Sequence, residues 1–128
     1  MSSLHALTNA MRAHGLRVST ARRRVLAALL AAERPLSAEQ IAGGSDLASV
    51  YRNLETLAAI GLVQHVHVGH GPGRYALATR GGGWAACRGC GDAVRLAPRA
   101  LAQIRAACGL ESLVTVVGLC PGCQGADA

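Results

Sequence analysis

The stretch Leu47-Ala-Ser-Val-Tyr-Arg-Asn-Leu-Glu-Thr-Leu-Ala-Ala-Ile-Gly61 gives the strongest indication of how the N-terminal half of the chain folds. Its apolar side chains recur at steps of three and four residues, which places them on one face of an α-helix: Leu47, Val50, Leu54, Leu57 and Ile60. The other face carries Ser49, Arg52, Asn53 and Thr56. Asp46 can cap the first turn and Gly61 can end the helix. The pattern therefore predicts a helix with one apolar and one polar face.

A shorter helix is expected just before this one. In Ser37-Ala-Glu-Gln40 each polar side chain can accept a hydrogen bond from the other residue's backbone amide, which is a capping box. Gly43-Gly-Ser-Asp46 then supplies a tight turn. A helix, a short glycine-containing turn and a second amphipathic helix form a helix-turn-helix, whose second helix normally lies in the major groove of DNA.

Two further helices are expected upstream. Residues 2–14 carry an apolar stripe, and Thr20 is a suitable N-cap for a helix over residues 21–32. Arg22, Arg23 and Arg24 crowd the first turn of that helix, where cations oppose the helix dipole. A phosphate group at this end would relieve the conflict, and a solvated arginine-rich turn is the alternative.

A hairpin is expected after the long helix. Residues 62–68 alternate, with His65 and His67 on one face, and residues 74–78 return as a second strand after a turn that contains His70. A hairpin directly after a recognition helix is the wing of a winged helix. Residues 1–79 are therefore expected to form a winged-helix DNA-binding domain.

A run of glycines marks the expected domain boundary at residues 80–83, which form a hinge. Beyond it the pattern predicts a helix from Pro98 to Cys108 and three strands, at residues 84–87, 93–96 and 113–117. Residues 84–128 are thus expected to form a small αβ domain, and the whole chain an α+β fold.

Composition and net charge limit the classes of partner that we expect for this protein. All 13 basic residues are arginine, and the formal net charge of +6 suits a polyanion such as nucleic acid. No apolar run is long enough to cross a membrane and no signal-peptide pattern is present, so we expect a cytoplasmic protein with no membrane partner. The absence of paired carboxylates, a phosphate-cradling loop or an activated nucleophile predicts neither an enzyme nor a small-molecule substrate.

Four of the five cysteines form two pairs of equal spacing, Cys87-Arg-Gly-Cys90 and Cys120-Pro-Gly-Cys123. Each pair can bind one ion from a single turn, and two pairs supply the four thiolates of a closed tetrahedral zinc site. One pair alone would also fit a thioredoxin-like redox motif, but neither pair stands at the start of a βαβ helix. We therefore predict one structural zinc ion per chain, held by all four cysteines.

Two further groups are ambiguous from the sequence. Cys108 is expected to be a small buried apolar side chain at a helix end, with a ligand or redox role as the alternative. His65, His67 and His70 could together chelate a transition metal, or could be exposed side chains of the wing.

Six stretches of the chain, in order and spanning residues 15–123, resemble the ferric uptake regulator family of metal-responsive repressors, including its zinc uptake branch. They are Gly15-Leu-Arg-Val-Ser-Thr-Ala-Arg-Arg-Arg-Val-Leu26, Ser49-Val-Tyr-Arg-Asn-Leu-Glu-Thr-Leu57, Gly61-Leu-Val63, Arg74-Tyr75, Cys87-Arg-Gly-Cys90-Gly91 and Gly118-Leu-Cys-Pro-Gly-Cys123. The resemblance implies that the winged helix binds a palindromic AT-rich operator in double-stranded DNA. It also implies that the αβ domain forms a homodimer and that the four cysteines hold structural zinc.

Carried onto matching positions, the resemblance gives four residues a role in DNA binding. Tyr51 and Arg52 would contact bases and phosphate, and Arg17 would reach the minor groove. Ser49 stands where the family usually has threonine. Because Tyr51 flanks the apolar stripe of its helix, part of its side chain can also pack.

The sequence departs from the family where the regulatory metal binds. The histidines usual before the first cysteine pair are replaced by Gly81-Gly-Gly-Trp84, and the histidine usual before the last pair is missing from residues 110–117. Gln64 and Ala78 stand where zinc-sensing relatives place Asp and Cys. The regulatory site is therefore expected to be absent, or rebuilt around the wing histidines.

The resulting hypothesis is a homodimeric DNA-binding transcriptional regulator, a repressor of metal-homeostasis genes with a structural zinc. Two alternatives stay open: a zinc-stabilised protein-interaction module, and a thiol redox switch, each with little DNA affinity of its own.

Overall fold

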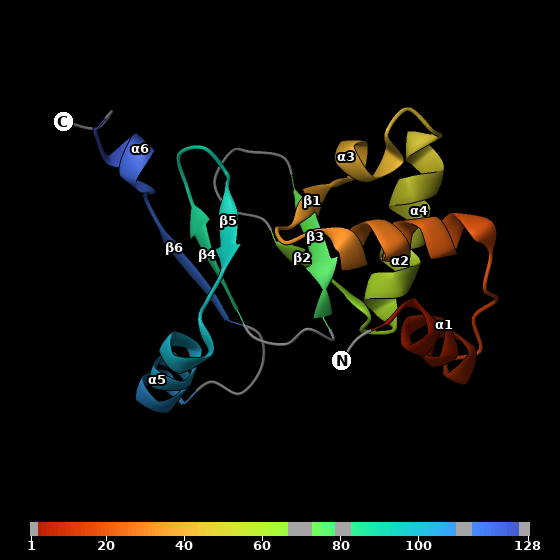
Figure 1. Cartoon of the computed structure of the whole chain (residues 1–128), viewed down its shortest axis with the longest axis horizontal. Helices are drawn as coiled ribbons and strands as arrows, with labels where there is room; N and C mark the ends of the chain where they lie inside the picture. Colours follow the sequence, from red (N-terminus) through yellow and green to blue (C-terminus); the bar gives the residue numbers. More distant parts are fainter. Residues whose placement is uncertain (1–2, 67–72, 79–82, 110–113, 126–128) are drawn as a thin grey trace. The chain divides into compact units, whose positions relative to one another are not determined.

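The computed structural model describes residues 3–66, 73–78, 83–109 and 114–125 of the chain, which form two compact units (Figure 1). The first comprises the described residues up to Val66 together with residues 73–78, and the second comprises residues 83–109 and 114–125. Helices and strands occur in both units, as the α+β prediction requires. No helix in the described ranges is long and apolar enough to span a membrane.

The first unit contains four helices and a three-stranded sheet. The helices are α1 (Leu4–Ala13), α2 (Thr20–Ala31), α3 (Ala38–Ala42) and α4 (Leu47–Ala59), and the strands are β1 (Leu36–Ser37), β2 (Val63–Val66) and β3 (Arg74–Leu77). The sheet order is β1-β3-β2, and both pairings are antiparallel. The β2–β3 hairpin follows α4 directly, which confirms the predicted order of helix-turn-helix and wing strands.

The core of this unit lies under α4. Leu54 and Leu57 are fully buried and Val50 nearly so, and they pack in one cluster with Met11 of α1 and Leu26 of α2. The apolar stripe predicted from the sequence is thus confirmed over most of the helix. Its first member differs, because Leu47 lies in the first turn of α4 with 37% of its surface exposed.

Helix caps explain where the helices of this unit begin. The predicted capping box is present, since the amide of Gln40 donates to Ser37 Oγ over 3.1 Å and the amide of Ser37 donates to Gln40 Oε1 over 2.8 Å. Asp46 caps α4 as predicted. The predicted Thr20 cap is wrong, because Ser19 Oγ accepts the first-turn amide and Thr20 is already helical.

The second unit is a three-stranded sheet with two helices. Its elements are β4 (Gly83–Cys87), β5 (Ala93–Arg95), α5 (Pro98–Cys108), β6 (Val114–Gly118) and α6 (Pro121–Gln124). In the order β5-β4-β6, β4 pairs with β5 antiparallel and with β6 parallel. A parallel pair needs a crossover, which runs through β5 and α5. Gly83, assigned to the hinge from the sequence, is the first residue of β4, and residues 80–82 lie outside the described ranges.

Candidate metal centre and nucleic-acid interface

The parallel pairing of β4 and β6 brings the two cysteine pairs together. Cys87 is the last residue of β4 and stands opposite Gly118, the last residue of β6. Both strands therefore end at the same edge of the sheet, where Cys90 lies in the turn after β4 and Cys120 caps α6. Figure 1 shows α6 at this end of the sheet and α5 at the other.

The four predicted ligands lie within reach of one ion. The Sγ atoms of Cys87, Cys90, Cys120 and Cys123 all lie within 4.8 Å of one another, and those of Cys90 and Cys120 are 3.9 Å apart. A tetrahedral zinc with bonds of about 2.3 Å requires sulfur atoms about 3.8 Å apart. The separation is far longer than the bond of about 2.05 Å in a disulfide. The cluster is therefore in position to bind a metal ion.

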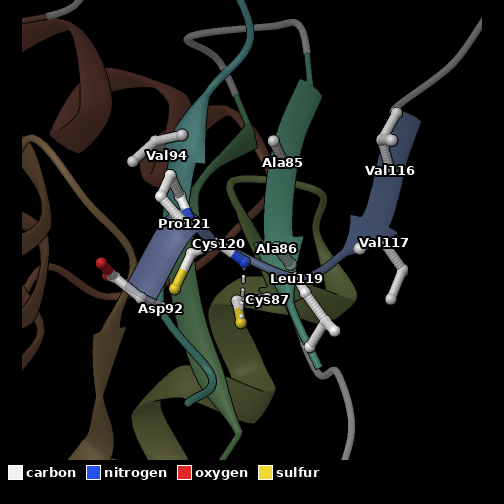
Figure 2. A pocket seen from close by; sticks show the side chains of 11 residues that line it. Ala85, Ala86, Cys87, Asp92, Val94, Val116, Val117, Leu119, Cys120 and Pro121 are labelled. Atoms are coloured by element: carbon white, nitrogen blue, oxygen red, sulfur yellow. Dashed lines mark hydrogen bonds between the residues drawn. The ribbon is translucent and has the colours of Figure 1, made fainter. Parts of the chain in front are cut away.

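Backbone amides favour thiolate at one member of the cluster. The amides of Cys120 and Gly89 each donate to Cys87 Sγ over 3.3 Å, and Figure 2 shows the first of these bonds as a dashed line. Hydrogen bonds from the backbone of Cys120 and Cys90 lower the pKa of Cys87 to about 6. Hydrogen bonding with the Cys120 and Cys87 side chains, and then burial, raises the pKa of Cys123 to about 12. A cation is therefore needed to hold four thiolates here.

Gly89 leaves the room that the cluster needs. A Cβ atom at this position would lie 3.1 Å from the Sγ and 3.2 Å from the Cβ of Cys123. Gly89 lies in the turn between Cys87 and Cys90, where a glycine allows a tight backbone. The structure shows that the missing side chain also admits the fourth ligand.

Cys108 does not belong to the cluster. The prediction of a buried apolar side chain at Cys108 is wrong, because Cys108 is exposed in the last turn of α5. Leu101 is the one buried residue of that helix, and its last turn carries no buried side chain.

The structure describes one of the three wing histidines. His65 lies in β2, where its ring packs on that of Tyr75 with centroids 4.9 Å apart, whereas His67 and His70 lie outside the described residues. Among the residues that the structure describes, the four cysteines form the one metal-ligand cluster of three or more side chains.

Helix α4 carries three of the four predicted DNA-binding residues, all outside its buried stripe. Tyr51 and Arg52 are exposed and Ser49 is half-buried. The guanidinium of Arg52 makes no hydrogen bond or ion pair with a described residue. Arg17 is also exposed, in the loop between α1 and α2.

Tyr51 has a partner that the sequence did not reveal. Its hydroxyl donates to Glu39 Oε1 of α3 over 3.3 Å. Desolvation and the adjacent Glu39 carboxylate raise the pKa of Tyr51. The hydroxyl is thus engaged within the protein, and a negative charge lies beside the polar face of α4.

Arg22 and Asn53 form a second contact that sequence reasoning missed. Arg22 Nε donates to Asn53 Oδ1 over 3.2 Å, and Arg22 Nη1 donates to the carbonyl of Arg17 over 2.8 Å. The three arginines predicted to act together therefore differ in their contacts. Arg22 is bonded within the protein, whereas Arg23 and Arg24 are exposed and make no side-chain hydrogen bond or ion pair with the described residues.

Comparison with known proteins agrees with this geometry. The sequence model of the Ferric uptake regulator family matches residues 13–112. No curated protein matches the sequence at a significant level.

Solved structures of similar fold cover nearly the whole chain. The Helicobacter pylori ferric uptake regulator Fur, described as having three functional metal-binding sites, is 20% identical with a TM-score of 0.75, covering 96% of this chain and 95% of its own. The manganese-containing Pseudomonas aeruginosa regulator is 25% identical with a TM-score of 0.68, covering 89% and 97%. The structure called holo XcZur is 24% identical with a TM-score of 0.57, covering 95% and 96%.

The family model matches residues 13–112, which is most of the chain, and the solved structures above share its fold. The chain therefore belongs to the ferric uptake regulator family of metal-responsive transcriptional regulators.

Proposed function

We propose that this chain is a homodimeric repressor of metal-homeostasis genes that binds operator DNA through α4 and holds one structural zinc ion. The observation that carries the proposal is the polar face of α4, where Arg52 is exposed and without a partner among the described residues. Because this guanidinium has no partner to give up, it can donate hydrogen bonds to a guanine edge or to phosphate without breaking a contact within the protein. Arg17, Arg23 and Arg24 add exposed positive charge in the same unit.

Zinc is the metal that the donor set favours. Four thiolates in a closed cluster leave no open coordination position, which is typical of structural and not catalytic zinc. Reduced cysteines of this kind also suit the cytoplasm, where we place the protein. The regulatory site usual in the family is absent or rebuilt in this chain, with His65 as its one described candidate.

The second unit has a surface suited to a second copy of the chain. Strand β6 lies at the edge of the described sheet, and Val116 and Val117 are 39% and 52% exposed. Val94 and Val116 flank Ala85 on one face, beside a cavity of about 460 Å³ (Figure 2). Pairing this edge and covering these valines in a homodimer would remove apolar surface from water.

The test is binding to duplex DNA selected by the protein from a random-sequence library. Arg52→Ala is expected to weaken binding roughly 10- to 100-fold, as the loss of one bidentate base contact would. Arg99→Ala removes the same charge from the exposed start of α5 and should change affinity less than about threefold. If the wild-type protein enriches no sequence, or if Arg52→Ala binds as well as wild type, the protein-interaction module becomes the better account.

A further inference from the structure

Arg22 joins the start of α2 and the loop before it to α4, although Arg22 and Asn53 stand 31 positions apart in the sequence. Its backbone amide donates to Ser19 Oγ over 3.2 Å at the start of α2. Its side chain reaches Asn53 of α4 through Nε and the carbonyl of Arg17 through Nη1. One half-buried residue thus connects the helix that carries Arg52 with the loop that carries Arg17.

Asn53, the partner of Arg22 on α4, also borders a cavity. This cavity of about 380 Å³ lies between α2, α3 and α4, lined in part by Arg24, Ser49 and Asn53. The hydrogen bonds of Arg22 therefore add a polar connection between α4 and the α1–α2 loop, whose Leu16 and Val18 also pack against the core.

We propose that Arg22 is a positioning residue, which holds Arg17 and the polar face of α4 at a fixed spacing and does not itself bind phosphate. The inference rests on the proposed DNA-binding function. Fixing two groove-contacting elements before binding lowers the entropy lost when DNA is bound. This positioning role distinguishes Arg22 from its exposed neighbour Arg23, although the sequence predicts the same role for both.

The experiment compares charge-conserving substitutions in the full chain with the selected duplex. Lysine keeps the charge of arginine but cannot span Asn53 and the Arg17 carbonyl with a planar fork. Arg22→Lys is therefore expected to weaken binding roughly tenfold, as the loss of two hydrogen bonds would. Arg99→Lys makes the same change at the exposed start of α5 and is the matched control, and its affinity should stay within about twofold of wild type.

The salt dependence separates positioning from phosphate binding. The logarithm of the DNA association constant falls linearly with the logarithm of the salt concentration, and each lost phosphate contact makes this slope less steep by about 0.9. Arg23→Ala should show this decrease, whereas Arg22→Ala should weaken binding with the slope unchanged. Asn53→Ala removes one of the two hydrogen bonds that Arg22→Lys removes, so the double variant should bind about as weakly as Arg22→Lys alone.

The inference is overturned if Arg22→Lys binds like wild type, or if the effects of the Arg22 and Asn53 variants add in full. Hydrogen exchange of the DNA-free protein gives an independent readout. The amides of residues 16–18 should exchange faster in Arg22→Lys than in Arg23→Lys. Equal exchange in both would refute the connection itself. Faster exchange in a protein that selects no duplex would instead refute the proposed function and leave the connection standing.

Discussion

Removal of zinc should unfold the second unit while the helices of the first persist. Among the described residues of the second unit, the buried apolar side chains are Trp84, Ala86, Cys87, Ala93 and Leu101. Trp84 and Leu101 are the two large ones, and burying such side chains stabilises by about 2 to 3 kcal/mol each. Ordering the backbone costs about 1 to 2 kcal/mol per residue. Structural zinc contributes about 10–16 kcal/mol, as much as the whole stability of a typical domain.

The chain carries its own reporter for this prediction. Its single tryptophan, Trp84, is 2% exposed in β4, whereas four of the six helices in the described part of the chain lie in the first unit. Chelation should shift Trp84 fluorescence to longer wavelength and make it accessible to quenchers, while most of the helical circular dichroism is retained. Restoring zinc should reverse the change.

Two cysteine variants control for the chelator itself. Cys90→Ser should reproduce the exposed Trp84 emission without any chelator, because a ligand has been lost. Cys108→Ser alters a cysteine outside the cluster and should behave as wild type. Unchanged Trp84 fluorescence after zinc has been shown to be absent would refute the claim that the metal holds this unit together.

Three further predictions test other parts of the site. Gly89→Ala should weaken zinc binding roughly 10- to 100-fold in a competition titration, because its Cβ would crowd Cys123; Gly118→Ala, whose Cβ meets nothing within 4 Å, should not. Glu39→Gln should tighten duplex binding several-fold at low salt by removing a negative charge beside Tyr51 while keeping an acceptor; unchanged or weaker binding would place Glu39 away from the DNA. With zinc bound, an alkylating agent should modify exposed Cys108 and spare the four ligands until zinc is removed, as mass spectrometry can show; modification of a ligand while zinc is bound would favour the redox switch.

Short-range chemistry made much of the fold predictable from the sequence. The period of α4, the Ser37 capping box and the bounds of α5 depend on residues a few positions apart, so the sequence contains their signals. The four-cysteine cluster was also predictable, because the spacing within each pair reflects the geometry of the ion.

Tertiary contacts and very short elements were not predictable in the same way. Arg22 and Asn53 stand 31 positions apart, and no periodic pattern links them. The exposure of Cys108 depends on where the neighbouring sheet supports α5, which the helix pattern does not contain. Strand β1 has two residues and α6 has four, both too short to show a period.

The most direct test of the central claim measures zinc content and duplex affinity on the same preparation of protein purified without added metal. The account predicts one zinc ion per chain, and binding of the selected duplex that is lost when the zinc is removed and recovered when it is restored. Full zinc occupancy without binding to any duplex, or duplex binding by a protein that holds no zinc, would contradict it.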